Sequence, residues 1–231
     1  MEQKGGHKIG VMGGTFNPVH YGHLLIAENA FEQFSLDKVV FMPTGHSPHK
    51  DEAQILDAAH RSEMIKLAIA DNPHFSCSDY EVQKDDVSYT YLTLQAFHER
   101  FPGNELYFIM GADSLAYLDR WQNPKEISEL CIVLAAVRDG LNIRELTNIQ
   151  DFLHKKYGTR IAFINTPNFS VSSCMIRSRV EASESIRYLV PDAVEQYIKQ
   201  HGIYSFKGHE NQKVEDERFR KIPKKITAIY G

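Results

Sequence analysis

The sequence predicts an α/β protein with a doubly wound, mostly parallel sheet in a single domain. Five short apolar runs of strand length recur along the chain, and segments whose apolar residues follow helical spacing separate them. Strands that alternate with helices form a parallel sheet through right-handed crossovers, with helices on both faces. The 231 residues are 42% hydrophobic and 24% charged, which excludes disordered, collagen-like and coiled-coil chains.

The expected elements alternate along the chain. The strands are expected at Lys8–Met12, Lys38–Met42, Glu105–Met110, Cys131–Val137 and Arg160–Ile164. The helices are expected at Tyr21–Phe34, Ala58–Ala70, Tyr91–Arg100, Ser114–Leu118 with Lys125–Leu130, Ile143–Lys156, Cys174–Ala182 and Asp192–His201. One further strand is expected at Phe75–Val82, although charged residues interrupt it. Ligands bind such sheets at the carboxyl ends of the strands, near the point where the strand order reverses.

Residues 1–205 are expected to form this domain, followed by a charged tail, 206–231, without an assigned role. The tail holds seven basic and four acidic side chains, so it carries +3, and residues 1–205 carry −7 of the total net charge of −4. A charged terminal segment is usually solvated. The overall negative charge argues against general nucleic-acid binding, so any contact with a polyanion must be local.

The chain is expected to be cytoplasmic. Its longest strongly apolar run, Cys131–Val137, is far shorter than the roughly 20 residues that a bilayer requires, and Met1–Lys8 does not resemble a signal peptide. The three cysteines, Cys77, Cys131 and Cys174, form no Cys-x-x-Cys pair. We therefore expect free thiols, with neither a disulfide framework nor a cysteine-based zinc site.

The first strand runs into a glycine turn, Gly13-Gly14-Thr15-Phe16, and then into a helix. Glycines let the backbone approach a ligand closely, and a helix N-terminus offers unpaired N–H groups, which together suit a phosphate. The turn matches neither Gly-x-Gly-x-x-Gly nor the Walker A pattern, and a glycine pair alone is usually only a turn. The histidines that follow it strengthen the phosphate interpretation.

His20 and His23 stand three residues apart, on one face of the first helical turn, and Gly22 between them is expected to leave room for a ligand. A single histidine at this place would more often be a cap or a packed ring. As a pair, the two can donate to oxygens on adjacent phosphates and stabilise the charge that builds up when a phosphoanhydride breaks. They need not act as bases.

The loop Pro43–Lys50 follows the second strand, and its two prolines and one glycine make it an exposed loop at the same rim. It is either a lid that brings His49 and Lys50 onto the outer phosphates or a solvated basic loop, and the sequence does not favour one over the other.

A second helix start lies near the end of the chain, where Ser172 or Ser173 supplies the N-cap and Arg177 stands one turn further on the face of Ser173. A cap and a surface arginine are the ordinary explanation. Hydroxyls, free N–H groups and a guanidinium at a helix N-terminus also form an anion site, suited to the β and γ phosphates of a nucleotide.

Zinc is the minor alternative at the two pairs His20-x-x-His23 and His46-x-x-His49, because metal-dependent hydrolases cluster histidines. No carboxylate lies close in sequence to the pair His20-x-x-His23. Gly22 and Pro48 also fit a phosphate loop better.

The Gly-Gly-Thr-Phe, His-x-Gly-His and Ser-Ser-x-x-Ile-Arg elements occur in this order, and with them the chain resembles the His-x-Gly-His nucleotidyltransferase superfamily. It resembles the bacterial nicotinate-mononucleotide adenylyltransferases most. Further matches are Pro48-His49-Lys50, Ser88-Tyr89-Thr90, Gly111-Ala112-Asp113 and Trp121. The resemblance covers about residues 8–204 and implies a Rossmann-like nucleotidyltransferase fold. It also implies transfer of AMP from ATP to nicotinate mononucleotide, which gives nicotinate adenine dinucleotide and pyrophosphate in NAD biosynthesis.

The resemblance further implies roles for single residues. The catalytic residues would be His20, His23 and Arg177, and the ATP-binding residues Gly13, Gly14, Thr15, Phe16, His49, Lys50, Ser172 and Ser173. Thr90, Asp113 and Trp121 would bind the mononucleotide, Trp121 by stacking on the pyridine ring. Mg²⁺ would enter with ATP, held by phosphates and water without protein ligands. The partners would be ATP and nicotinate mononucleotide, and no nucleic acid or membrane is expected. Whether the chain forms a homo-oligomer is left open.

Several positions have a plainer explanation or depart from the family pattern. Asp113 can be the N-cap of Ser114–Leu118, and Trp121 can be a core residue. The departures are Asn17 in place of aspartate, Cys174 in place of threonine, and Arg138-Asp139-Gly140 in place of Arg-Pro-Gly. These departures do not change the reaction class that the resemblance implies, but the contacts that these positions make are not implied by it.

Two other functions compete with this one. A phosphopantetheine adenylyltransferase of the same superfamily is the nearer, although such enzymes are generally shorter. A non-catalytic nucleotide-sensing module acting through the tail is the second, and the intact His20, His23 and Arg177 argue against it. The adenylyl transfer needs no general base, because the attacking phosphate is already ionised and catalysis comes from positioning and charge neutralisation.

Overall fold

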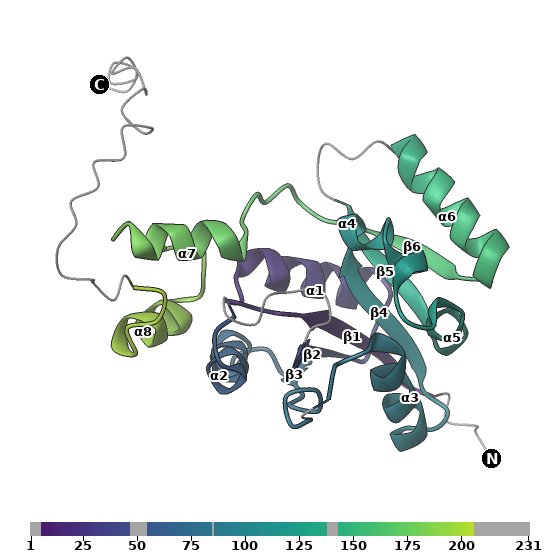
Figure 1. The fold of residues 1–231 in the computed structure, drawn as a ribbon, viewed down its shortest axis with the longest axis horizontal. Helices are drawn as coiled ribbons and strands as arrows, with labels where there is room; N and C mark the ends of the chain where they lie inside the picture. Colours follow the sequence, from purple (N-terminus) through teal and green to yellow (C-terminus); the bar gives the residue numbers. More distant parts are fainter. Residues whose placement is uncertain (1–5, 47–54, 85, 138–142, 206–231) are drawn as a thin grey trace.

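The computed structural model describes residues 6–46, 55–84, 86–137 and 143–205, which form one six-stranded parallel sheet with helices on both faces (Figure 1). The strands are β1 (Lys8–Gly14), β2 (Lys38–Pro43), β3 (Phe75–Cys77), β4 (Glu105–Gly111), β5 (Cys131–Val137) and β6 (Arg160–Asn165). Their order across the sheet is β3-β2-β1-β4-β5-β6, and every neighbouring pair is parallel. The expected doubly wound sheet is confirmed, and its strand order reverses between β1 and β4.

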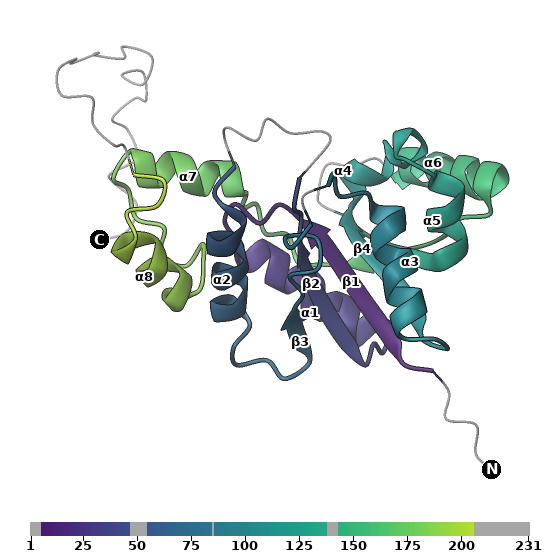
Figure 2. The ribbon, with the colours of Figure 1, turned by 60° about the horizontal axis from the view of Figure 1, so that its bottom comes forward.

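The helices divide between the two faces of the sheet. They are α1 (Tyr21–Gln33), α2 (Ala58–Ala68), α3 (Thr90–Arg100), α4 (Ala112–Leu115), the 3-10 turn η2 (Leu118–Arg120), α5 (Pro124–Leu130), α6 (Ile143–Tyr157), α7 (Ser173–Glu181) and α8 (Asp192–Gln200). One buried cluster joins the sheet to α1, α2, α7 and α8, and a second joins its other face to α3, η2, α5 and α6. Figure 2 shows α7 and α8 at one end of the molecule, beside α2, and α3, α5 and α6 at the other.

The alternation of β-strand side chains explains the two clusters. In β2, Val39 and Phe41 belong to the cluster under α1 and α2, whereas Val40 and Met42 belong to the one under α3 and α5. A strand buried on both faces reads as a continuous apolar run, because successive side chains point to opposite sides. This is why the apolar runs located the strands to within two residues.

Two expected elements differ from the structure. The strand expected at Phe75–Val82 ends at Cys77, because the Asp79 carboxylate turns away from the strand to pair with Lys66 of α2 at 2.9 Å. The helix expected at Ser114–Leu118 begins at Ala112, after the extended residue Gly111. The expectation that Asp113 is its N-cap is therefore wrong: this residue lies inside the first turn.

The described residues include no helix long and apolar enough to cross a membrane. The division of the chain at residue 205 stays a prediction, because 206–231 lie outside the described residues.

Candidate active site

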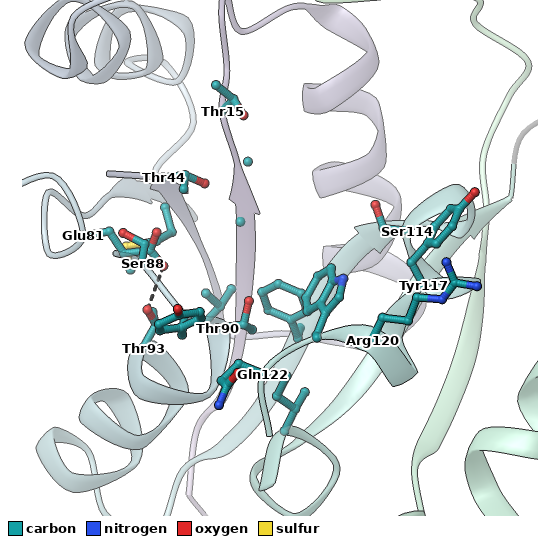
Figure 3. Close-up of a pocket in the computed structure, with 18 residues that line it drawn as sticks. Thr15, Thr44, Glu81, Ser88, Thr90, Thr93, Ser114, Tyr117, Arg120 and Gln122 are labelled. Carbon is teal, nitrogen blue, oxygen red and sulfur yellow. Dashed lines mark hydrogen bonds between the residues drawn. The ribbon is translucent and has the colours of Figure 1, made fainter. Parts of the chain in front are cut away.

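A cavity of about 510 Å³ lies beside the carboxyl ends of β1 and β2, where the strand order reverses (Figure 3). Glu81, Ser88 and Thr93 stand on one side of it, and Tyr117 and Arg120 on the other. Doubly wound sheets bind their ligands at this place, since no helix covers the strand ends there.

Five of the residues expected to bind nucleotide or substrate line this cavity: Gly13, Gly14, Thr15, Thr90 and Trp121. The Trp121 ring also meets Phe108 edge to face, with 6.1 Å between ring centroids and 81° between ring planes. Trp121 is half-buried. Trp121 therefore packs on the core and also lines the cavity, and its stacking on a substrate ring stays a prediction.

The glycine turn is shaped by the ring of Phe16. A Cβ atom on Gly14 would come within 3.0 Å of that ring, so a side chain at Gly14 would displace it. The Phe16 side chain is 2% exposed and belongs to the core beneath the sheet, beside Phe41. Contact between Phe16 and a nucleotide is consequently restricted to its main chain.

His20 and His23 stack on each other at the start of α1, with 3.7 Å between ring centroids and 25° between ring planes. His20 is the extended N-cap residue, and its main-chain N–H donates to Nδ1 of His23 at 3.2 Å. Because Nδ1 accepts this bond, the proton of a neutral His23 sits on Nε2, which becomes a hydrogen-bond donor of fixed direction.

Gly22 has a different role from the one expected. A Cβ atom there would lie 3.0 Å from Nδ1 of His20, and Gly22 itself is buried. The missing side chain leaves room for the His20 ring and not directly for a ligand.

Helix α7 is bound to the loop that precedes α1. Ser172 is its N-cap, accepting from the main-chain N–H of Met175 at 3.2 Å, which decides between the two serines. The Ser173 hydroxyl donates to the carbonyl of Pro18, and Arg177 Nη1 donates to the carbonyl of Asn17, both at 2.8 Å. The structure thus brings the α7 residues to the loop that leads into His20.

Of the remaining expected site residues, the structure describes only Asp113, and this residue is not part of the arrangement. Asp113 is exposed on α4 and is absent from the described lining of the cavity. His49 and Lys50 lie outside the described residues, as does Asp139. In the described ranges, no group of three or more histidine, cysteine, aspartate or glutamate residues is placed to hold a metal ion.

Sequence reasoning missed two buried polar residues beside the cavity, Arg61 and Glu81. Glu81 is 8% exposed and accepts from the Thr93 hydroxyl at 2.7 Å, and its burial raises the pKa of the carboxyl group. Arg61 is 2% exposed and donates to three main-chain carbonyls. A signal for Arg61 existed, because it shares an apolar helical stripe with Met64, Ile65 and Ala68.

Comparison with known proteins places the chain among nucleotidyltransferases. The sequence model of the Cytidylyltransferase-like family matches residues 11–179. The chain is 43% identical over 197 residues to a probable nicotinate-nucleotide adenylyltransferase of Lachnoclostridium phytofermentans, covering 85% of this chain and 98% of that protein. It is 42% identical over 197 residues to another from Synechococcus sp. strain JA-3-3Ab, covering 85% of this chain and 94% of that one.

Solved structures share the fold. The nicotinic acid mononucleotide adenylyltransferase of Plasmodium falciparum, complexed with NaAD, superposes with a TM-score of 0.71 at 19% identity, covering 86% of this chain and 97% of that one. A putative nicotinate-nucleotide adenylyltransferase from Vibrio parahaemolyticus gives 0.61 at 20% identity, covering 86% and 95%. At these identities the likeness is one of fold.

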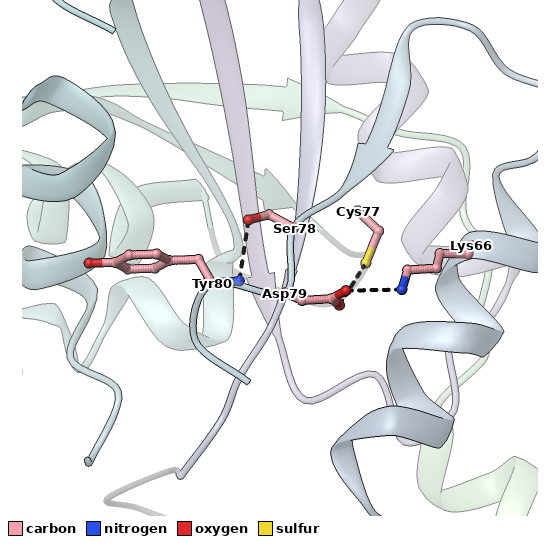
Figure 4. Close-up of polar contacts among 5 residues, drawn as sticks. All are labelled: Lys66, Cys77, Ser78, Asp79 and Tyr80. Atoms are coloured by element: carbon pink, nitrogen blue, oxygen red, sulfur yellow. Dashed lines mark hydrogen bonds and ion pairs between the residues drawn. The ribbon is translucent and has the colours of Figure 1, made fainter. Parts of the chain in front are cut away.

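The three cysteines are free, as expected, and differ in environment. Cys174 is exposed in the first turn of α7. Burial raises the pKa of the Cys131 thiol to about 12, and burial together with the Asp79 carboxylate does the same for Cys77 (Figure 4). Because the thiolate is the reactive form, we expect iodoacetamide at pH 8 to modify Cys174 at least about tenfold faster than the other two.

Peptide mapping by mass spectrometry measures the three rates in the folded protein, and Cys174→Ser is the control that removes the fast label. Labelling of Cys77 at the rate of Cys174 would contradict the described burial.

Proposed function

Because the chain belongs to the Cytidylyltransferase-like family, and within it to the nicotinate-nucleotide adenylyltransferases, we propose that it transfers the AMP moiety of ATP to nicotinate mononucleotide. The products are nicotinate adenine dinucleotide, the deamido precursor of NAD, and pyrophosphate. The observation that supports this proposal is the loop after β1, at the switch point of the sheet. It runs from the glycine turn, which lines the cavity, to the stacked His20 and His23, and its Asn17 carbonyl binds Arg177.

The triphosphate of ATP is proposed to lie on the glycine turn and at the start of α1. Main-chain groups of Gly13, Gly14 and Thr15 border the cavity there. His23 would donate from Nε2, the atom left with the proton by the bond between its Nδ1 and the main chain of His20. Such a donor, fixed before the reaction begins, stabilises charge on the transferring phosphate without having to reorient.

The outer phosphates are proposed to meet the start of α7. The Ser173 hydroxyl donates its proton to the carbonyl of Pro18, whereas the Ser172 hydroxyl accepts from Met175 and keeps its own O–H as a donor. The proposed donors to the phosphates are therefore the Ser172 hydroxyl and main-chain N–H groups of the first turn. The guanidinium of Arg177 has five N–H groups, and one of them donates to the carbonyl of Asn17. Its other N–H groups are proposed to bind phosphate oxygens, and His49 and Lys50 remain proposed partners of the same phosphates.

Nicotinate mononucleotide is proposed to occupy the part of the cavity lined by Thr90 and Trp121. The indole would stack on the pyridine ring, since its contact with Phe108 orients it. Asp113 would reach a substrate only from the rim, since it is exposed on α4.

The reaction is an in-line displacement at the α-phosphorus of ATP. A phosphate oxygen of the mononucleotide forms the new P–O bond while the bond between the α-phosphorus and the bridging oxygen breaks, and pyrophosphate leaves with that oxygen. No proton has to be removed from the nucleophile. The chain's residues therefore bind, orient and neutralise charge.

Magnesium is proposed to arrive with ATP. Glu81 is the only carboxylate in the described lining of the cavity, and it is already bonded to Thr93. This donor set fits an ion held by phosphate oxygens and water better than an ion in a protein cage. When bound, Mg²⁺ neutralises phosphate charge.

We also propose that residues 1–205 are the catalytic unit and that the protein works in the cytoplasm.

The proposal is tested by pyrophosphate release from Mg-ATP with nicotinate mononucleotide or phosphopantetheine supplied separately. We expect release with the mononucleotide, formation of nicotinate adenine dinucleotide by mass spectrometry, and loss of both when EDTA removes the metal. Release with phosphopantetheine instead would favour the sister enzyme. Nucleotide binding without release in either case would favour a sensing module.

For the transition-state role of His23, we expect His23→Ala to lower turnover by about 10²- to 10³-fold, the usual cost of losing a preorganised donor. His98→Ala, on the exposed end of α3, is the control for loss of an imidazole. Steady-state kinetics at saturating substrates measures the effect. Unchanged turnover in a His23→Ala protein with a native circular dichroism spectrum would disprove the role.

For the stacking role of Trp121, we expect Trp121→Ala to raise the KM for nicotinate mononucleotide about fivefold, since a stacked aromatic contributes about 1 kcal/mol. The KM for ATP should change less than about twofold, because the triphosphate does not touch the ring. Trp121→Phe should restore most of the affinity. Equal changes in both KM values, with a lower Tm, would mean that Trp121 acts only in the core.

A further inference from the structure

We propose that Arg61 is a positioning residue that holds the carboxyl ends of β1 and β2 in the spacing the active site needs. The guanidinium donates from Nη1 to the carbonyl of Thr15 at 2.8 Å and from Nη2 to the carbonyl of Thr44 at 2.8 Å. Its Nε donates to the carbonyl of Leu56 at 2.9 Å, so one planar group joins three chain segments. The inference rests on the proposed function for its kinetic consequence.

The two strand ends are the edge of the cavity. Thr15 and Thr44 both line it, and Figure 3 shows them at the ends of neighbouring strands. A second bond joins these ends, from the main-chain N–H of Thr44 to the carbonyl of Gly14 at 2.9 Å. Arg61 itself is not in the described lining of the cavity, so it acts on the site through the main chain of the two strand ends.

Burial of the Arg61 guanidinium costs desolvation free energy, which a residue that only fills space would not require. Its side chain is buried, and burial lowers the pKa of the guanidinium, although arginine stays charged at neutral pH. In the described part of the chain, no carboxylate lies within ion-pair distance of it, and main-chain carbonyls replace the counter-ion. An apolar side chain would fill this volume without the desolvation cost.

The substitution Arg61→Lys distinguishes the effect of positive charge from the effect of hydrogen-bond geometry at this position. An ammonium group keeps the positive charge, but it is a point donor on a flexible chain and cannot reproduce a planar fork that reaches three carbonyls at once. Arg61→Lys should therefore let the two strand ends move apart while the core stays folded. Small displacements of a preorganised site cost rate, up to about 10²-fold for 1 Å.

The matched control is Met64→Ala, one turn further along α2. Met64 is fully buried in the same core cluster as α2 and the sheet, so its truncation lowers stability through a cavity and cuts no bond to the strand ends. Both variants are compared with the parent at a temperature where circular dichroism shows all three folded.

We expect Arg61→Lys to lower kcat about 10²-fold while the KM values for both substrates change less than about threefold. Met64→Ala should lower Tm at least as much and leave kcat within about threefold of the parent. Equal kcat in the two variants, or a loss of kcat that follows Tm in both, would overturn the positioning role.

Hydrogen exchange gives a readout that does not depend on activity. In Arg61→Lys, the main-chain N–H of Thr44 should exchange faster relative to the interior of β2, whereas Met64→Ala should raise exchange in the sheet evenly. A parent without adenylyl transfer would disprove the proposed function alone, and exchange would still decide the role of Arg61. Unchanged relative exchange at Thr44 would disprove that role even in an active enzyme.

Discussion

The active site depends on how the loop between β1 and α1 is held. Main-chain carbonyls of this loop need hydrogen-bond donors once they are buried, and two helices, α2 and α7, supply them. Arg61 of α2 binds Thr15, whereas α7 binds Asn17 through Arg177 and Pro18 through Ser173. Because the loop leads directly into His20, these bonds also set the start of α1 and the stacked histidine pair.

The same bonds make the site a property of the whole domain. The hydroxyl of Tyr204, after α8, donates to the Asn17 side chain at 2.7 Å, across 187 residues of sequence. Asn17 Oδ1 also accepts from the main-chain N–H of Leu56 at 3.4 Å. An aspartate would offer the same acceptor, which explains how asparagine can stand where relatives are expected to carry aspartate. Residues as far along the chain as 204 therefore contact this loop.

The sequence was sufficient for features that depend on local pattern. Buried parallel strands appear as apolar runs, and the glycine turn with its histidines follows the first of them directly. Features set by contacts between side chains could not be predicted. Asp79, just beyond the end of β3, pairs with Lys66, and the His20 ring lies where a side chain at position 22 would stand. The role of Arg61 depends on three carbonyls that no spacing rule brings together.

Electrostatics explains how a chain with a net charge of −4 can hold two polyanions. Screening in salt limits the influence of exposed charges to about 10 Å. The electrostatic potential at the strand ends is therefore determined by the charged groups nearby and not by the net charge of the chain. Arg61 and Arg177 both lie close enough to Tyr204 to lower the pKa of its phenol, against the larger effect of burial, which raises it. Within the described ranges neither guanidinium has a carboxylate partner at ion-pair distance. Their charge therefore adds to that of the α1 and α7 N-termini, so positive charge gathers beside these helix starts although residues 1–205 carry a net negative charge.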